Sequence, residues 1–270
     1  MNRTILLALT AAASAAPVCA QEDGADASQD LAKQLANPIA SLISVPIQVN
    51  FDDGIGPSGG GQRWTINVQP VVPIAISADW NMISRTIVPI VAQDDIDPSG
   101  DSEFGLGDTV QSLFFSPREV GDSGVIWGAG PVFLLPTATD RALGGEKWGI
   151  GPTVVVLKQS GKLTTGVLAN QIWSVAGADD RAKVSRGFLQ PFTSYTTEKA
   201  TTIGLNAEIS YDWRSDQATV PINATLSQLV TLGSQPVQIG GGFRYYVEAP
   251  PQGPDWGLRF NLTFLFPTGK

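Results

Sequence analysis

The feature that most constrains the fold of this chain is an alternation of apolar and polar residues with a period of two. It is clearest over residues 203–213, where every second residue is apolar or aromatic and those between are small, polar or charged. The closing segment, residues 256–266, repeats the pattern. A period of two is typical of β-strands that have two different faces. The pattern therefore predicts a β-sheet protein.

Comparable segments recur along the chain between clusters of Gly, Pro, Asp and Ser, which are typical of turns. They run approximately over residues 41–51, 63–77, 80–92, 104–117, 124–136, 147–158, 162–175, 187–198, 201–214, 218–231, 236–248 and 256–266. An even number of strands lets hairpins close a barrel with both termini at one end. We therefore expect an all-β, transmembrane, antiparallel up-and-down β-barrel of about 12 strands over residues 41–267.

Geometry tests whether such a barrel has a usable interior. About 12 strands, spaced about 4.7 Å apart and tilted by about 40°, form a backbone cylinder roughly 24 Å in diameter. Inward side chains would leave a bore of about 10 to 12 Å, between a filled eight-stranded barrel and a general porin. Bulges or breaks are expected at prolines inside the strands, since proline cannot donate a ladder hydrogen bond. These are Pro70, Pro73, Pro89, Pro152, Pro191 and Pro221.

The N-terminus predicts export. Arg3 precedes an apolar run over residues 5–18, and the sequence Val-Cys-Ala closes the run before Gln21. This is the pattern of a cleaved signal peptide, residues 1–20, with a retained anchor as the alternative. The chain has 1 cysteine, Cys19, so cleavage leaves no thiol.

The segment after the signal, residues 21–40, is expected to be a flexible leader. Residues 21–30 are polar and acidic, with too few apolar groups to pack. Residues 31–35 favour a helical turn or two, ended by Asn37 and Pro38. Whether this segment plugs the barrel is left open by its sequence.

Composition excludes several classes of function. The formal net charge is -8 and no basic tract is present, which argues against a nucleic-acid partner. The chain contains 0 histidines, so Ser-His hydrolysis, Asp-His proteolysis and His-ligated metal chemistry are excluded. We expect no enzyme, no cofactor and no metal site.

Clustered carboxylates could instead form a site for a hard cation such as Ca²⁺. EF-hand spacing is absent, so a solvated acidic loop is the favoured interpretation. The residues concerned are Asp94, Asp95, Asp97, Asp101, Glu103, Asp179 and Asp180.

Four charged residues are candidates for the lumen because the alternation places them on the polar face. They are Glu208, Arg244, Glu248 and Arg259. An arginine facing lipid at the midplane would cost about 2 to 4 kcal/mol, so these side chains should point inward. They would form either a charged constriction that filters solutes or a mutually neutralising ladder that fixes strand register.

Aromatic and apolar residues are expected on the outer surface. The predicted lipid-facing residues are Ile209, Tyr211, Phe260, Leu262 and Phe264. Six tryptophans near strand ends predict interfacial girdles, although an inward ring could instead stack on a solute. They are Trp80, Trp127, Trp148, Trp173, Trp213 and Trp256.

The last strand also carries a short assembly pattern. Asp255, Gly257, Phe260 and Leu262 resemble the polar-x-Gly-x-x-apolar-x-apolar signal by which outer-membrane barrels are recognised. The expected partners are therefore the barrel assembly machinery, outer-membrane lipid and lipopolysaccharide.

Several blocks resemble a known family. They are SEFGLGD (102–108), QSLFFSP (111–117), WGAGPVFLLPTATD (127–140), EKWGIGPTVVVLKQ (146–159), IWSVAG (172–177) and WGLRFNLTFLFP (256–267). Over about residues 31–267 the chain resembles the outer-membrane proteins of the meta-pathway of phenol degradation family, some of which carry the name neuromedin U. The resemblance implies a β-barrel and a link to uptake of hydrophobic or aromatic compounds, and it supplies no catalytic residues.

Two classes of function follow from the sequence. The first is an outer-membrane channel or transporter for small, hydrophobic or aromatic molecules, working by passive diffusion. The second is a structural or surface-interaction barrel with an occluded lumen. Continuity of the lumen distinguishes the two.

Overall fold

The structure is a computed structural model that describes residues 19–96 and 100–267. Its described part contains one helix and fifteen strands. They are α1 (Cys19–Leu35), β1 (Ile43–Ile55), β2 (Gly61–Val68), β3 (Val71–Ala75), β4 (Trp80–Asp94), β5 (Glu103–Leu106), β6 (Thr109–Pro117), β7 (Val125–Leu135), β8 (Lys147–Ser160), β9 (Leu163–Gly177), β10 (Ser185–Thr196), β11 (Thr201–Ala207), β12 (Ile209–Asp212), β13 (Gln217–Leu232), β14 (Gln235–Glu248) and β15 (Trp256–Phe266).

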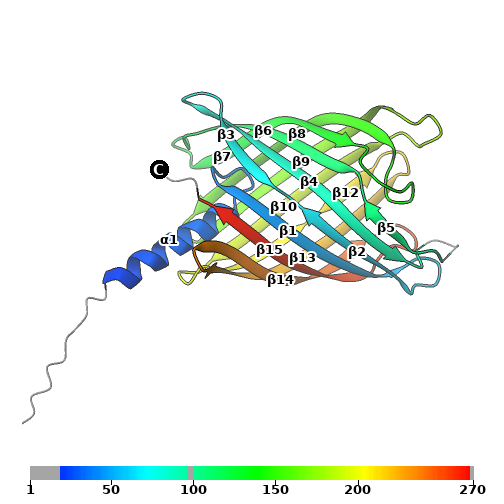
Figure 1. Ribbon diagram of the computed structural model, residues 1–270. Helices are drawn as coiled ribbons and strands as arrows, with labels where there is room; N and C mark the ends of the chain where they lie inside the picture. The colour runs from blue at the N-terminus through cyan, green and yellow to red at the C-terminus, as the bar shows by residue number, and fades with distance from the viewer. Residues whose placement is uncertain (1–18, 97–99, 268–270) are drawn as a thin grey trace, which may run out of the picture.

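These strands form a closed antiparallel barrel of 12 strands (Figure 1). Three of the 12 are interrupted, so β2 with β3, β5 with β6, and β11 with β12 each make one barrel strand. The barrel closes where β1 pairs with β15, from Ile43 opposite Phe266 to Asp53 opposite Trp256. The predicted fold class is confirmed, and each predicted segment matches one barrel strand.

Prolines lie at all three interruptions. At the one between β5 and β6, the N–H of Gly107 donates to the carbonyl of Pro89 over 2.9 Å, and Pro89 has no N–H to return a bond. Pro70 lies in the gap between β2 and β3. Glu208 lies in the gap between β11 and β12, where its N–H donates to the carbonyl of Pro221 over 3.0 Å. Pro221 has no N–H to return a bond to Glu208, so the ladder is incomplete there. The expected disruption is wrong at Pro73 and Pro191, which lie in unbroken registers opposite Ile83 and Val167.

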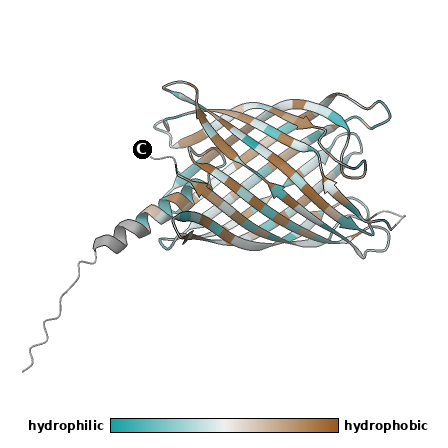
Figure 2. Cartoon of the chain, in the orientation of Figure 1, coloured by the Kyte–Doolittle hydropathy of each residue, from teal (hydrophilic) through white to brown (hydrophobic). Residues whose placement is uncertain are grey.

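The two faces of each strand differ as the alternation predicts, and Figure 2 shows apolar and polar residues following one another along the strands. On β15, Phe260 is 51% exposed on the outer surface, whereas its neighbour Arg259 is 4% exposed and points inward. Leu262 and Phe264 share the outer face with Phe260. β11 and β12 pair with β13 in the same register, so the alternation continues from one to the other. Ile209 and Tyr211 therefore share the outer face with the exposed Ile203 and Leu205.

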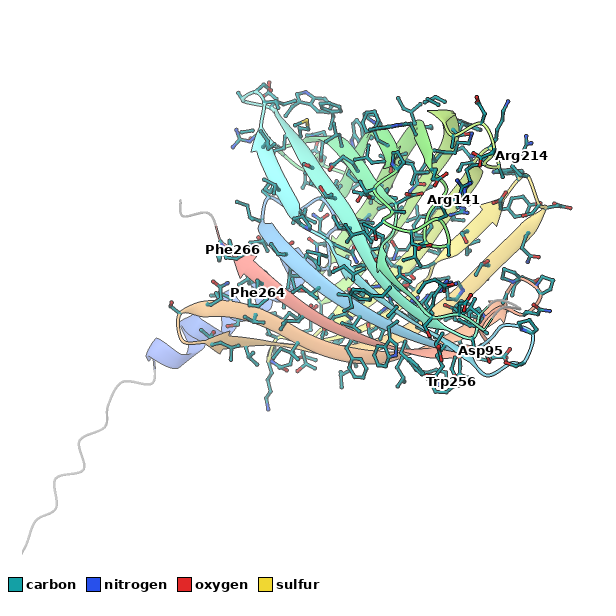
Figure 3. All side chains as sticks on the ribbon, turned by 45° about the vertical axis from the view of Figure 1, so that its right-hand side comes forward. Asp95, Arg141, Arg214, Trp256, Phe264 and Phe266 are labelled. Carbon is teal, nitrogen blue, oxygen red and sulfur yellow. The ribbon has the colours of Figure 1, made fainter. Side chains whose placement is uncertain are left out.

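The two ends of the barrel are unlike each other. At one end, here called the loop end, lie the longer connections, whose described residues are 56–60, 95–96, 100–102, 136–146, 178–184, 213–216 and 249–255. At the other, the helix end, lie α1, the last strand residue Phe266 and the connections 76–79, 118–124, 161–162, 197–200 and 233–234. Figure 3 shows Asp95, Arg141 and Arg214 at the loop end, far from Phe266.

The helix is longer than the sequence indicated. We expected one or two turns from Leu31, whereas α1 begins at Cys19 and ends at Leu35. Residues 21–30 favour a helix more than we allowed, since Ala, Glu and Gln have high helix propensity and acidic residues suit the first turns. The predicted signal peptide lies almost wholly outside the described residues. No described helix is long and apolar enough to cross a membrane.

The segment from residue 31 to residue 42, here called the plug segment, fills the helix end of the barrel. One buried cluster joins Ala32, Ala40 and Leu42 to Leu229 and Leu265 of the wall, with Leu31 and Leu35 packed against it. A second cluster surrounds Ile39, and its wall residues are Ile83, Phe114, Val155, Leu157 and Leu168. The Gln159 side chain also donates to the Lys33 carbonyl over 2.8 Å. The sequence left a plug open as a possibility, and the structure shows one.

Candidate functional site

The interior of the barrel contains two adjoining cavities. The larger, of about 460 Å³, lies toward the loop end and is lined mainly by amide, hydroxyl and charged side chains. The smaller, of about 210 Å³, lies between the plug segment and the wall. Gln69, Arg85 and Gln190 line both, so the two cavities meet at these residues. We therefore take this lumen as the candidate site.

An arginine and a glutamate form an ion pair in the wall of the larger cavity. Arg259 on β15 donates through Nη1 and Nη2 to the two carboxylate oxygens of Glu208, over 2.8 and 2.9 Å. Its Nε also donates to Asn50 on β1 over 2.8 Å. The register partner of Arg259 on β14 is Gly242, which has no side chain to stand between the two charges. A two-bond pair of this kind fixes both side chains in orientation as well as position.

A second arginine extends the same network. Arg244 on β14 lies 3.8 Å from Glu208 and 3.5 Å from Asp52 on β1. Its Nη2 donates to the hydroxyl of Tyr246 over 3.0 Å, and that hydroxyl donates to Asp52 over 2.8 Å. Two arginines and two carboxylates are thereby joined on one wall of the lumen. We call Asp52, Glu208, Arg244 and Arg259 the charged network.

Gly257 lets this network close. On β15 it stands between Asp52 and Arg244, which are its register partners on β1 and β14. A Cβ at position 257 would lie 2.3 Å from the Phe51 carbonyl oxygen and 2.6 Å from an Asp52 carboxylate oxygen. Both distances are shorter than real contacts allow, so only glycine leaves room for the ion pair above it.

The four charged candidates from the sequence do not all meet. Glu208, Arg244 and Arg259 come together, whereas Glu248 lies exposed at the last residue of β14, beside the connection 249–255. The alternation from Arg244 does not continue to Glu248, because a register shift opposite Val220 and Pro221 leaves Val247 unpaired between them. Asp52, its partner Tyr246 and Asn50 were missed.

A further polar chain begins beside the charged network, because Arg63 is the register partner of Asp52. Arg63 on β2 donates to the Gln93 side chain over 3.0 Å, and Gln93 donates to Glu103 over 3.0 Å. Arg63 thus has a carboxylate at the end of a short relay. This wall contributes no unbalanced charge.

Arg85 on β4 is different, because it forms no ion pair with a described carboxylate; it was not among the predicted lumen residues. It donates through Nη2 to the Gln69 side chain over 2.9 Å. Its register partner on β3 is the apolar Val71. Arg85 is therefore a cation held by a neutral amide at the junction of the two cavities.

The tryptophans lie on the outer surface in two groups. At the helix end, Trp80 and Trp127 pack edge to face with ring centroids 5.9 Å apart. At the loop end lie Trp148, Trp173, Trp213 and Trp256, joined by Trp64, which we had not included. All seven are exposed, as girdle residues would be. None of the seven tryptophans is an inward ring that could stack on a solute in the lumen.

The residues of the assembly pattern occupy two faces of one strand. Phe260 and Leu262 point outward, and Gly257 faces the lumen. Asp255 precedes β15, and its N–H donates to the Asp53 carbonyl. The close approach at Gly257 is sufficient reason for that glycine, and recognition by an assembly machinery stays a prediction.

The acidic clusters lie in connections at the loop end. Ser102 donates to Asp94 and Ser58 donates to Asp95. Arg141 donates to Asp180 over 2.7 Å, and this bond lowers the pKa of the Asp180 carboxyl from its usual value. Within residues 19–96 and 100–267, no three His, Cys, Asp or Glu side chains group as metal ligands. Asp97 lies outside the described residues.

Comparison with known proteins supports the fold. No protein-family profile matches the chain, and no curated protein matches its sequence. Among solved structures, the chain is similar to the COG4313 outer membrane channel from Pseudomonas putida F1, with a TM-score of 0.64 and 14% identity over 83% of this chain and 94% of that chain. This likeness shows the fold of an outer-membrane β-barrel.

Two further structures are less similar. The outer membrane phospholipase of Salmonella typhi, a dimer with bound calcium, has a TM-score of 0.48 and 11% identity over 88% of this chain and 98% of that chain. The beta domain of the Bordetella autotransporter BrkA has a TM-score of 0.46 and 11% identity over 83% of this chain and 100% of that chain.

Proposed function

We propose that this protein is an outer-membrane channel that lets small molecules diffuse through its lumen. The observation that carries the proposal is the pair of adjoining cavities inside an apolar outer wall. A polar lumen in a membrane barrel is where water and solute can pass, whereas the outer face meets lipid. The charged network on one wall would bias which solutes pass.

The orientation follows from the connections. Outer-membrane barrels have short periplasmic turns and longer extracellular loops. The helix end, with connections as short as residues 161–162, is then periplasmic, and the loop end faces outward. Solute would enter at the loop end, cross the larger cavity and leave past the plug segment.

Small aromatic or hydrophobic molecules are the proposed cargo. The resemblance to the phenol degradation family supports this cargo, and the similarity to a solved outer membrane channel supports the channel itself. An enzymatic role is disfavoured because the chain contains 0 histidines.

The plug segment favours a second candidate function. Its buried contacts at the helix end would also suit a structural barrel with an occluded lumen. The two candidates differ in whether the plug segment moves aside.

Liposome swelling separates them. Liposomes that contain the folded protein should admit phenol, benzyl alcohol and small sugars faster than protein-free liposomes. Swelling no faster than in protein-free liposomes, for every solute, would reject the channel and leave the structural barrel.

The charged network gives a sharper test of the same proposal. Replacing Arg244 or Arg259 by Ala should shift the cation-to-anion permeability ratio toward cations, because a charge within about 8 to 10 Å biases passing ions. Glu248→Ala is the matched control and should change the ratio little, since its side chain is exposed at the mouth. Equal shifts for all three variants would remove the network from the solute path.

A further inference from the structure

The lumen contains an arginine, Arg85, that forms no ion pair with a described carboxylate, and the nearest charges are already paired with other arginines. Among the described residues that line the two cavities, the charged ones are Asp52, Arg85, Glu208, Arg244 and Arg259. The two carboxylates are engaged by Arg244 and Arg259, as described above. The lining therefore has a formal charge of plus one, and Arg85 carries it.

The bonding of Arg85 leaves most of its donors available. A guanidinium has five N–H groups in a rigid fork that matches a carboxylate. One bond from Arg85 is formed, to the neutral side chain of Gln69. Arg85 lines both cavities, so its guanidinium is within reach of a ligand that enters either one.

The smaller cavity supplies a different surface beside this cation. Its wall is mixed: Val71 and Phe192 from the barrel and Leu35, Pro38 and Leu42 from the plug segment form an apolar part, beside polar residues such as Gln34, Asn37 and Gln238. Val71 is directly opposite Arg85 in the ladder between β3 and β4. A charged head bound by Arg85 would thus have an apolar surface next to it on the side of the plug segment.

The size of that cavity fits one ring. An apolar cavity of about 150 Å³ engineered in another protein binds benzene. The cavity here measures about 210 Å³. It therefore has room for a single aromatic ring or a short alkyl chain.

From these observations we propose that Arg85 is the anchor of a binding site for small amphipathic carboxylates, such as an aryl carboxylate. The carboxylate lies against the Arg85 guanidinium, with Gln190 facing it from β10, and the apolar part enters the smaller cavity against Val71 and Phe192. The site deepens the proposed channel function by naming a substrate class, and it rests on that function for its role in transport. Binding itself can be measured without transport.

The test is a calorimetric titration of the folded, full-length mature barrel in a non-ionic detergent. Benzoate is the probe, and benzyl alcohol and chloride are the matched partial ligands. Benzoate should bind more tightly than either, since it alone has both the charge and the ring. Arg85→Gln should weaken benzoate binding by about 10- to 100-fold, the usual loss for a hydrogen bond to a charged group. It should leave benzyl alcohol unchanged.

Two further variants keep the test independent of folding. Arg214→Gln removes an arginine from an exposed turn at the loop end and should bind benzoate as the wild type does. Val71→Thr is nearly isosteric and should weaken benzoate while leaving chloride unchanged. A folded barrel that still migrates as a compact species before heating shows that each variant is intact.

The outcomes separate the site from the channel. Benzoate binding equal to that of benzyl alcohol or chloride, or unaffected by Arg85→Gln, overturns the carboxylate site even if liposomes swell. Tight, Arg85-dependent binding in a barrel that admits no solute supports the site and rejects the channel. Hexanoate in place of benzoate distinguishes an alkyl from an aryl ligand.

Discussion

The two halves of the lumen share one barrel wall yet differ in what their inward residues contact. Toward the loop end, inward side chains are charged or polar and surround the larger cavity. Toward the helix end, they are apolar and pack on the plug segment, as Val155 at 0% exposure and Leu157 at 2% illustrate. The alternation determines which residues point inward. Inward residues are polar where they surround the larger cavity and apolar where they pack on the plug segment.

The first prediction tests the apolar half, where we expect the largest effect. Phe114 is fully buried beside Ile39 of the plug segment. Phe114→Ala should lower the free energy of unfolding by about 3 to 5 kcal/mol, because a large cavity opens in a packed cluster. Urea unfolding in lipid vesicles measures it.

The neighbouring Phe115 is the matched control for this variant. It points outward and is 37% exposed. Phe115→Ala should cost clearly less, since its loss creates no internal cavity. Equal costs for the two variants would mean that the plug segment does not pack as described.

The second prediction tests the charged half. Glu208→Gln keeps the size of the side chain but leaves Arg259 and Arg244 without their shared carboxylate. Breaking a buried pair in this way costs about 3 kcal/mol. Glu248→Gln, at the exposed end of β14, should stay within about 0.5 kcal/mol of the wild type. A Glu208 variant as stable as the Glu248 variant would show that the network is not closed.

The third prediction concerns the glycine beneath the network. Gly257→Ala should destabilise the barrel by about 1 to 3 kcal/mol, the range for overpacking, because the new methyl group meets β1 and Asp52. Gly241→Ala is the control, since its Cβ would find its nearest neighbour at 3.5 Å, an ordinary contact. If Gly257→Ala also leaves ion selectivity unchanged, the ion pair above Gly257 does not line the path.

Most of the fold could be predicted from the sequence because the face that each strand residue occupies depends only on its position in the alternation. Whether a residue faces lipid or the interior follows from its parity, so all 12 strands were predicted within a few residues. Glu208, Arg244 and Arg259 were predicted together for the same reason. The family resemblance added the expectation of transport.

The plug was harder to predict because the sequence feature that indicates it lies in a barrel strand and not in the plug segment itself. Residues 154–157 read Val-Val-Val-Leu, apolar on both faces. A strand apolar on both faces is buried on both sides, which indicates an interior partner. The leader itself is acidic and polar over residues 21–30, and nothing in it identifies the surface on which its end packs.

The missed lumen residues have equally particular causes. Asp52 lay just beyond the predicted end of its strand at residue 51, so it was assigned to a turn. Arg85 stands between Ile83 and Ile87 on the same face of β4. Two isoleucines on one face of a strand suggest that this face meets lipid, so an arginine between them is not expected to lie in the lumen. Only the packing of Ile83 against Ile39 shows that this face is internal.

Single-channel recording in planar bilayers shows whether the polar lumen conducts and whether the plug segment limits conduction. Ile39→Asn places a polar group in the apolar cluster and should loosen the plug segment. We expect current steps from the wild-type barrel and longer-lived or larger steps from Ile39→Asn. If folded barrels of both kinds leave the bilayer silent, the lumen is not a conducting path.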